Sequence, residues 1–269
     1  MVTHLDCCAV HVYRKVIIVS LYKRVLVKLV KEFTEDWYDA KYFSDPKGKK
    51  FTRPDGSVEY WGYMSTDGDI GGADRIASAW KTMFKPKNML IIGCGRGAMV
   101  AYAREAGIEA FGFDWSKYAV GEGRFSRCKR DWVTVHDATK PWPYPDNSFD
   151  SIVALDLFEH IYLENLDFVI SEVFRVCRKW CFLEIATVDG KKEKGYILKK
   201  GEPIPIAEDA RTWAGHVLVT TQDWWEDKFD HEDWVTRRDM VNWFFALLSP
   251  QTIPNWLVNT VLVLSKTDE

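Results

Sequence analysis

The chain has 269 residues, of which 47% are hydrophobic and 28% are charged, and its formal net charge is −3. A chain of this length and apolar content can bury a full core, so we expect one large domain, with or without an N-terminal extension, and no general disorder. The slightly negative charge provides no basic field for non-specific binding of nucleic acid, which weakens the case for a DNA or RNA substrate.

Residues 1–30 mix β-branched residues with regularly spaced lysines and arginines. Their apolar runs are far shorter than the roughly 20 residues of a membrane-spanning helix. No small-residue cleavage site of a secretory signal follows them. We predict an amphipathic N-terminal extension that packs on the domain or on a partner. A helix on a membrane surface and non-native sequence before the true start are the alternatives.

Residues 31–72 are rich in glycine, aspartate, lysine and aromatic residues. Turn signals such as Asp45-Pro46 and Asp67-Gly68 predict mostly loop with short elements. A long loop region in a compact chain is usually either disordered or functional. The aromatic content favours packing, so we predict that this segment forms a cap, or lid, over a binding site.

From residue 73 onward the pattern alternates between helices and strands. Helices are expected over residues 73–84, 98–107 and 164–177, and strands over 88–93, 109–114, 132–137, 148–156, 179–187, 233–238 and 259–266. Strands that alternate with helices imply an α/β domain, doubly wound around a mostly parallel sheet with right-handed crossovers. We assign residues 73–269 to this domain.

The strongest local signal is the glycine loop Gly93-Cys94-Gly95-Arg96-Gly97, between the strand at 88–93 and the next helix. Small residues allow a tight turn and close approach of a ligand, and the helix N-terminus offers free N–H groups. Asp114 ends the following strand, where a carboxylate can accept hydrogen bonds from both ribose hydroxyls of an adenosine group. Strand, loop, helix, strand and acid together predict a site for an adenosine cofactor.

The glycine spacing distinguishes between adenosine cofactors. A dinucleotide loop reads G-x-G-x-x-G, whereas this one reads G-x-G-x-G, with Ala98 and Met99 where a further glycine would stand. The spacing resembles motif I of the class I S-adenosylmethionine-dependent methyltransferases, in which the loop touches the amino-acid end of the cofactor. The acidic residue that often precedes the strand in that family is Asn88 here.

The resemblance extends to about residue 186 and points to the small-molecule, type-11-like branch. It rests on WPYPDNSFDSIVALD before and within the strand at 148–156 and on the FEHI sequence that follows. It implies a seven-stranded Rossmann-like sheet with an antiparallel last strand, S-adenosyl-L-methionine as methyl donor and S-adenosyl-L-homocysteine as product. Asp137 would contact the adenine amino group. The cofactor-binding residues implied are Gly93, Gly95, Gly97, Asp114, Trp115, Asp137, Ala138 and Leu155.

A second similarity begins at His216. GHVLVTTQDWWEDKF resembles a segment with the pattern H-x₇-W-W-x₃-F in some sugar, lipid and natural-product methyltransferases. The W-W-x₃-F spacing places two aromatic residues on one helical face, so we expect Trp224, Trp225 and Phe229 to belong to the core rather than to the site.

Methyl transfer is an in-line displacement that requires a positioned nucleophile and, for a protonated acceptor, removal of a proton. Histidine suits that role, and His216 and His160 are the candidate bases by position. Glu159 and Asp156 are alternatives that would need a raised pKa. We expect His136 and Asp137 to point to opposite faces of the sheet. The candidate substrate-binding residues are Tyr42, Trp61, Tyr63 and Asp156, with simple loop packing as the alternative for the three aromatic residues.

No motif for methylation of adenine or cytosine is present, which favours transfer to an oxygen or nitrogen of a small metabolite, sugar or natural product. One alternative is a methyltransferase for RNA or protein, for which lysines at 47–50 and 191–200 would form the footprint. The other is a non-catalytic protein that retains the cofactor fold. No duplex DNA partner is expected, and the oligomeric state stays open, with a homodimer as one option.

The six cysteines show no paired Cys-x-x-Cys spacing. This is typical of reduced thiols in a cytoplasmic protein, and the sequence pattern predicts no metal site.

Overall fold

The computed structural model describes residues 33–52, 58–63, 67–189, 195–200, 215–248, 253, 257 and 260–267. The extension expected over residues 1–30 lies outside these ranges and stays a prediction. In the described part of the chain, no helix is long and apolar enough to cross a membrane.

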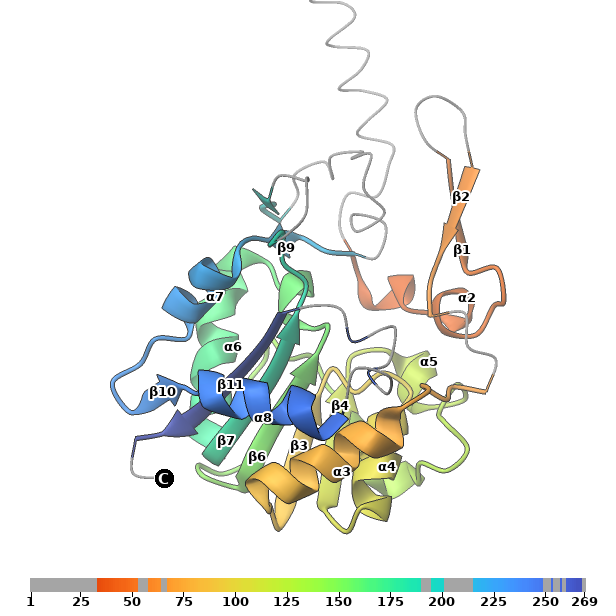
Figure 1. The fold of residues 1–269 in the computed structure, drawn as a ribbon. Coiled ribbons are helices and arrows are strands. Elements are labelled where there is room, and N and C mark those ends of the chain that lie inside the picture. Colours follow the sequence, from red (N-terminus) through yellow and green to blue (C-terminus); the bar gives the residue numbers. More distant parts are fainter. Residues whose placement is uncertain are drawn as a thin grey trace, which may run out of the picture.

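A seven-stranded sheet forms the centre of the molecule, in the order β10-β11-β7-β6-β3-β4-β5 (Figure 1). Its strands are β3 (Asn88–Ile92), β4 (Glu109–Asp114), β5 (Val133–Val135), β6 (Phe149–Leu155), β7 (Cys177–Ile185), β10 (Trp234–Thr236) and β11 (Thr260–Lys266). Neighbours from β5 to β7 pair in parallel, whereas β11 is antiparallel to both β7 and β10. The predicted doubly wound sheet with an antiparallel last strand is therefore confirmed.

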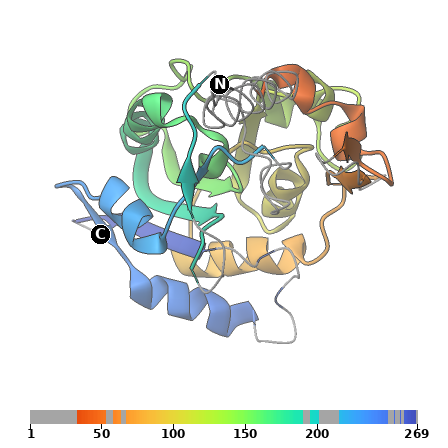
Figure 2. The same ribbon diagram turned by 90° about the horizontal axis from the view of Figure 1, so that it is seen from above.

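Helices cover both faces of the sheet (Figures 1 and 2). On one face lie α3 (Ala73–Phe84), α4 (Ala98–Glu105) and α8 (Arg238–Leu248), and on the other lie α6 (Leu163–Val176) and α7 (Gln222–Lys228). The shorter elements of the domain are α5 (Lys117–Val120), η2 (Arg130–Trp132), η3 (Phe158–His160), β8 (Tyr196–Ile197) and β9 (Leu218–Val219).

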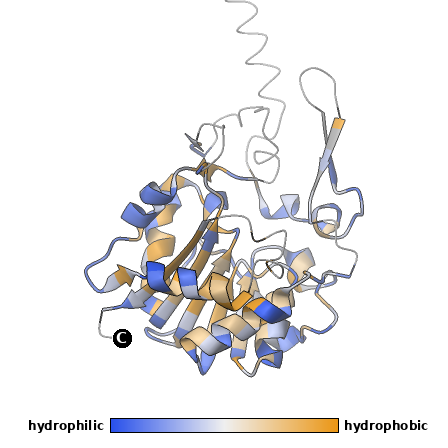
Figure 3. Ribbon diagram, in the orientation of Figure 1, coloured by the Kyte–Doolittle hydropathy of each residue, from blue (hydrophilic) through white to orange (hydrophobic). Residues whose placement is uncertain are grey.

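The central strands are apolar along most of their length because helices cover both faces. In β6, every residue except the last is buried, and the strands contain much of the hydrophobic colour inside the molecule (Figure 3). Trp225 and Phe229 of the W-W-x₃-F segment are buried in the core beside α6, while Trp224 packs at its edge. The expected core role is confirmed for Trp225 and Phe229, whereas Trp224 is only partly buried.

Short elements precede the domain: η1 (Glu35–Trp37), α2 (Ala40–Phe43) and the antiparallel hairpin of β1 (Lys49–Thr52) with β2 (Val58–Trp61). They lie above the carboxyl ends of the parallel strands (Figure 1). The carboxylate of Asp39 begins α2 by accepting hydrogen bonds from two backbone N–H groups of its first turn. Hydrogen bonds connect this segment to the domain, among them one from the Ser116 hydroxyl to the Tyr38 carbonyl and one between the hydroxyls of Ser44 and Tyr118.

Candidate functional site

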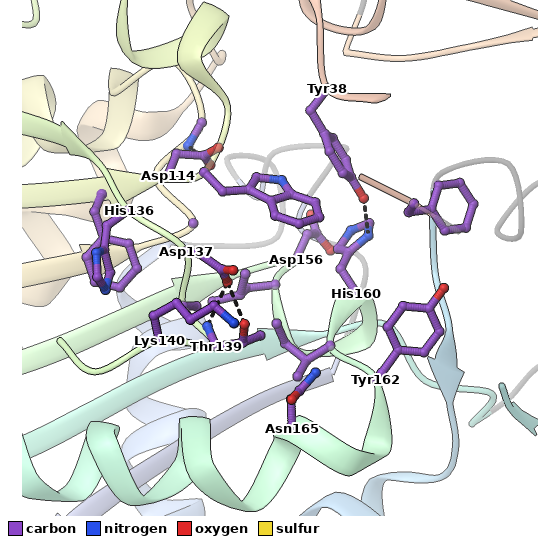
Figure 4. Close-up of a pocket in the computed structure, with 18 of the residues that line it drawn as sticks. Tyr38, Asp114, His136, Asp137, Thr139, Lys140, Asp156, His160, Tyr162 and Asn165 are labelled. Carbon is purple, nitrogen blue, oxygen red and sulfur yellow. Dashed lines mark hydrogen bonds between the residues drawn. The ribbon is translucent and has the colours of Figure 1, made fainter. Parts of the chain in front are cut away.

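A pocket lies where the carboxyl ends of β3, β4, β5 and β6 meet (Figure 4). Strand β3 lies between β6 and β4 in the sheet. The chain leaves β3 toward β4 on one side and leaves β6 toward β7 on the other, so the loops after β3 and β6 diverge and leave a crevice. The cavity has a volume of about 230 Å³. Residues of the N-terminal segment, from Phe33 to Tyr63, form part of its wall.

The glycine loop supplies the wall next to β3. Gly93 and Gly95 line the pocket, and Gly95 has a φ of 52°, in the left-handed region that favours glycine. Gly97 does not line it. A Cβ on Gly97 would lie 2.6 Å from Sγ of Cys128, so this glycine allows close packing under the start of α4.

Asp114, the last residue of β4, cross-links the loop to the strand. Its Oδ2 accepts a hydrogen bond from the Gly95 N–H at 2.9 Å, and its Oδ1 accepts one from the Ser116 N–H at 2.8 Å. Burial raises the pKa of this carboxyl, and the two backbone donors oppose the rise. Because each carboxylate oxygen has more than one acceptor site, Asp114 can also accept hydrogen bonds from a ligand in the pocket.

Asp137 and Ala138 line the pocket beyond the end of β5. Oδ1 of Asp137 accepts hydrogen bonds of 2.8 Å from both the N–H and the hydroxyl of Thr139, which fixes the turn. His136 lines the same pocket, and its ring packs edge-to-face with Phe113. Strand β5 ends at Val135, and the alternation of side chains between faces ends with it.

The other residues predicted to bind the cofactor or substrate divide into three groups. Trp115, Tyr42, Tyr63 and Asp156 line the pocket. Leu155 ends β6 but does not line it, and its place in the wall is taken by Leu157. The backbone of Trp61 belongs to β2, but its side chain lies outside what the structure describes.

Of the two candidate bases, only His160 lines the pocket. Its Nδ1 and the Tyr38 hydroxyl share a hydrogen bond of 3.0 Å, visible in Figure 4. Burial lowers the pKa of His160 to about 4, so the imidazole is neutral at pH 7. His216 is buried against it, with the two rings perpendicular and their centroids 4.8 Å apart.

Glu159 completes this group of side chains. It is wholly buried, and its Oε1 accepts a hydrogen bond of 3.2 Å from the Ala186 N–H and lies 3.9 Å from Nε2 of His216. Burial, followed by the neighbouring carboxylate of Asp156, raises its pKa well above the ordinary value. The Val217 N–H donates a 2.7 Å hydrogen bond to the Glu159 carbonyl, which holds the segment after Gly215 against η3.

Several pocket residues were not predicted. Tyr38 and Phe43 stand in the same aromatic segment as Tyr42, so that segment was the available signal. Lys140, Tyr162 and Asn165 also line the pocket, and no pattern in the sequence distinguishes them from ordinary surface residues.

The sheet order and the glycine loop agree with a comparison against protein families. Residues 90–183 match the family model described as a methyltransferase domain. These residues form a methyltransferase domain of the class I fold. Within it lie the glycine loop, Asp114, Asp137, Asp156 and His160. The glycine loop after β3 and the two acids predicted from the sequence, Asp114 and Asp137, thus lie within the matched residues.

Solved structures resemble the chain at low identity. The structure described as "Conversion of a Disulfide Bond into a Thioacetal Group during Echinomycin Biosynthesis" is 16% identical, with 87% of this chain and 91% of that chain covered and a TM-score of 0.49. The plantazolicin methyltransferase BpumL in complex with SAH is 16% identical, with 72% and 82% covered and a TM-score of 0.48.

A third structure, the PH0226 protein from Pyrococcus horikoshii OT3, is 20% identical, with 44% of this chain and 54% of that chain covered and a TM-score of 0.35. The chain thus spans about half the length of that protein. The curated proteins contain no match to the sequence. The fold of this methyltransferase domain therefore rests on its own strand order and on the family match.

Proposed function

We propose that this protein uses S-adenosyl-L-methionine to methylate an oxygen or nitrogen of a small metabolite, sugar or natural product. The observation that carries the proposal is the meeting of Gly95, Asp114 and Asp137 in one pocket beneath an aromatic wall. In a methyltransferase domain, this combination supplies a place for each part of the cofactor.

The chemistry of the pocket fits this cofactor. Asp114 would accept hydrogen bonds from the ribose hydroxyls, and the turn at Asp137 and Ala138 would hold the adenine. Gly93 and Gly95 leave room for the methionine end. The bound cofactor supplies an electrophilic methyl group on a positively charged sulfonium. Carboxylates and the faces of aromatic rings such as Tyr42 and Tyr63 stabilise such a cation, by about 0.5–2 kcal/mol for each ring contact.

The acceptor would lie beside Asp156 and His160, on the side of the pocket that Tyr162 and Asn165 also line. In the transfer, a lone pair of the acceptor oxygen or nitrogen forms the bond to the methyl carbon. The pair of the breaking carbon–sulfur bond remains on sulfur, and the acceptor proton must be taken up. His160 is neutral at pH 7 and is the predicted base that faces the pocket, whereas His216 lies behind it.

One lysine of the basic footprint predicted for an RNA or protein acceptor is engaged within the protein, whereas Lys47 and Lys50 are exposed. The side chain of Lys49 is 13% exposed, lies 3.3 Å from the carboxylate of Asp39 and stands over the ring of Trp37. It is therefore engaged within the cap segment. Residues 191–194 of the second lysine run lie outside the described residues.

The first test is calorimetry of the purified protein with S-adenosyl-L-homocysteine and, separately, with NAD. We expect S-adenosyl-L-homocysteine to bind and NAD not to bind. Asp114→Ala should weaken binding by about 10–100-fold, in line with the loss of hydrogen bonds to a charged group. Asp131→Ala, an exposed carboxylate in η2, is the control.

An absence of binding to S-adenosyl-L-homocysteine would overturn the proposal and favour the non-catalytic alternative. An unchanged affinity in Asp114→Ala would show that this residue does not hold the ribose. To identify the acceptor, cell extracts are incubated with the protein and S-adenosyl-L-methionine labelled on the methyl group. Loss of the labelled product after nuclease or protease treatment would instead indicate a macromolecular acceptor.

A further inference from the structure

Three potential metal ligands converge at the wall of the pocket. Glu159 and His160 belong to η3 and His216 to the segment before β9, and one ligand atom of each lies within 4.8 Å of the other two. Glu159 and His216 are buried, and His160 lines the pocket. The group therefore extends from the interior to the place where the acceptor would bind.

The carboxylate of Glu159 is poorly compensated for a buried acid. Its Oε2 is buried and has no hydrogen-bond partner among the described residues. No lysine or arginine of the described chain forms an ion pair with it, and the neighbouring acid is Asp156. Burial of a charged carboxylate without a counter-charge is costly, so the group must either hold a proton or face a cation.

The two histidines are suited to hold such a cation. A metal ligand must offer a neutral imidazole with one ring nitrogen directed at the ion. The Tyr38 hydroxyl at Nδ1 fixes the orientation of the His160 ring, in the way that hydrogen bonds outside the coordination shell orient metal-binding histidines. Perpendicular packing of the rings of His160 and His216 brings the edge of one toward the other.

We propose that Glu159, His160 and His216 bind one divalent transition-metal ion. Two imidazoles and one carboxylate suit Mn²⁺, Fe²⁺, Co²⁺ or Zn²⁺ better than Ca²⁺ or Mg²⁺, which prefer oxygen ligands. Ligand atoms about 2.0–2.2 Å from an ion stand roughly 3 Å from each other, so the side chains must close in by one or two ångströms. Three protein ligands leave open positions toward the pocket.

The role of the ion rests on the proposed function. As a Lewis acid beside the acceptor, it would lower the pKa of an acceptor hydroxyl. The hydroxyl would lose its proton to water, the freed oxygen lone pair would form the bond to the methyl carbon, and the carbon–sulfur pair would stay on sulfur. With the ion bound, His160 would be a ligand, and water would replace it as the acceptor of the proton.

The test is binding of Co²⁺, followed by visible absorption, and of Mn²⁺, followed by electron paramagnetic resonance, to the full chain after dialysis against a chelator. We expect one ion per chain. Glu159→Gln and His216→Gln should each weaken binding by at least about tenfold, because each removes one ligand. His136→Gln is the matched control, since His136 lines the same pocket outside the cluster.

Thermal unfolding provides a readout that does not depend on activity. Co²⁺ should raise the Tm of the wild type and of His136→Gln, and at the same Co²⁺ concentration should raise the Tm of Glu159→Gln clearly less. Glutamine keeps an oxygen for the Ala186 N–H and has no charge to bury, so this variant is expected to fold.

Affinity for S-adenosyl-L-homocysteine is measured in the same samples. Equal binding of Co²⁺ and Mn²⁺ by the wild type and both cluster variants, or no binding by any of them, would overturn the metal site. If S-adenosyl-L-homocysteine still binds, loss of the metal site leaves the proposed methyltransferase function standing. Metal binding without binding of the product would support the site and overturn its role in methyl transfer.

Discussion

The hydroxyl of Tyr38 lies 3.0 Å from Nδ1 of His160 and connects the aromatic N-terminal segment to the turn after β6. Gly215 makes room for this contact. A Cβ at that position would lie 2.5 Å from the Tyr38 oxygen and 3.2 Å from Nδ1 of His160. Three separate parts of the chain therefore determine the orientation of one imidazole at the wall of the pocket.

Removal of the Tyr38 hydroxyl should affect both stability and the titration of His160. We expect Tyr38→Phe to lower the free energy of unfolding by about 1–2 kcal/mol, since it removes a hydrogen bond with a partly buried partner. Urea unfolding measures the first effect, and NMR of the histidine ring protons measures the second. Tyr118→Phe removes a different hydrogen bond between the cap segment and the domain, to Ser44, and should leave the His160 signal unchanged. Identical His160 titrations in all three proteins would contradict the connection.

Gly95 and Gly107 allow backbone strain to be separated from ligand binding. Both have positive φ values, 52° and 80°, so alanine at either position should cost about 1–2 kcal/mol of stability. A Cβ on Gly95 would lie 3.6 Å from the ring of Phe43 at the pocket, whereas one on Gly107 would meet nothing within 4 Å. We expect Gly95→Ala to weaken binding of S-adenosyl-L-homocysteine at least about tenfold by filling the space of the ligand, and Gly107→Ala to leave it unchanged. Calorimetry decides, and equal affinities would contradict the placement of the cofactor.

The lowered pKa of His160 predicts a loss of stability in mild acid. Burial lowers this pKa from the ordinary histidine value of 6.5 to about 4 in the folded protein. The unfolded chain therefore takes up the proton first as the pH falls, and this residue destabilises the fold progressively below pH 6.5 and has no such effect above it. Between pH 7 and pH 5, His160→Gln should lose less stability than the wild type, by up to about 2 kcal/mol.

Glu159 should make the stability of the fold depend on pH in the opposite direction to His160. Its raised pKa means that the folded protein retains a proton that the unfolded chain has released, so stability falls as the pH rises above the ordinary carboxyl pKa. In metal-free buffer at pH 8, Glu159→Gln should be at least as stable as the wild type. Urea unfolding of the wild type and both variants from pH 5 to pH 8 measures both slopes. Parallel curves would show that neither group has a shifted pKa.

The W-W-x₃-F segment gives a test of the core. Trp225 is wholly buried and packs on Phe158, the residue before Glu159, whereas Trp224 is partly exposed. We expect Trp225→Ala to cost about 3–5 kcal/mol, as is typical for removal of a buried aromatic side chain. Trp224→Ala should cost clearly less. Chemical unfolding followed by circular dichroism compares the two, and similar losses would contradict the core assignment.

Local patterns predicted most of the fold and the cofactor side of the site. Strand β4 and helix α3 have the bounds that the sequence indicated, because their apolar residues follow the period of the element. Asp114 could be placed because it ends a strand, and the ends of adjacent parallel strands meet at one edge of the sheet. The alternation expected for His136 and Asp137 does not apply to them, because strand β5 ends at Val135 and the ends of elements are weakly encoded.

By itself, the sequence determined the doubly wound sheet, the glycine loop, the acid at the end of β4 and the acid after β5, since each depends on residues close together in the chain. Only the tertiary structure decided that His160 faces the pocket, that His216 lies behind it and that Glu159 joins them. These contacts depend on how the segment after Gly215 packs against η3, through the hydrogen bond from Val217 to Glu159. Side chains distant in sequence meet there because the core fixes both segments, and no local period encodes that meeting.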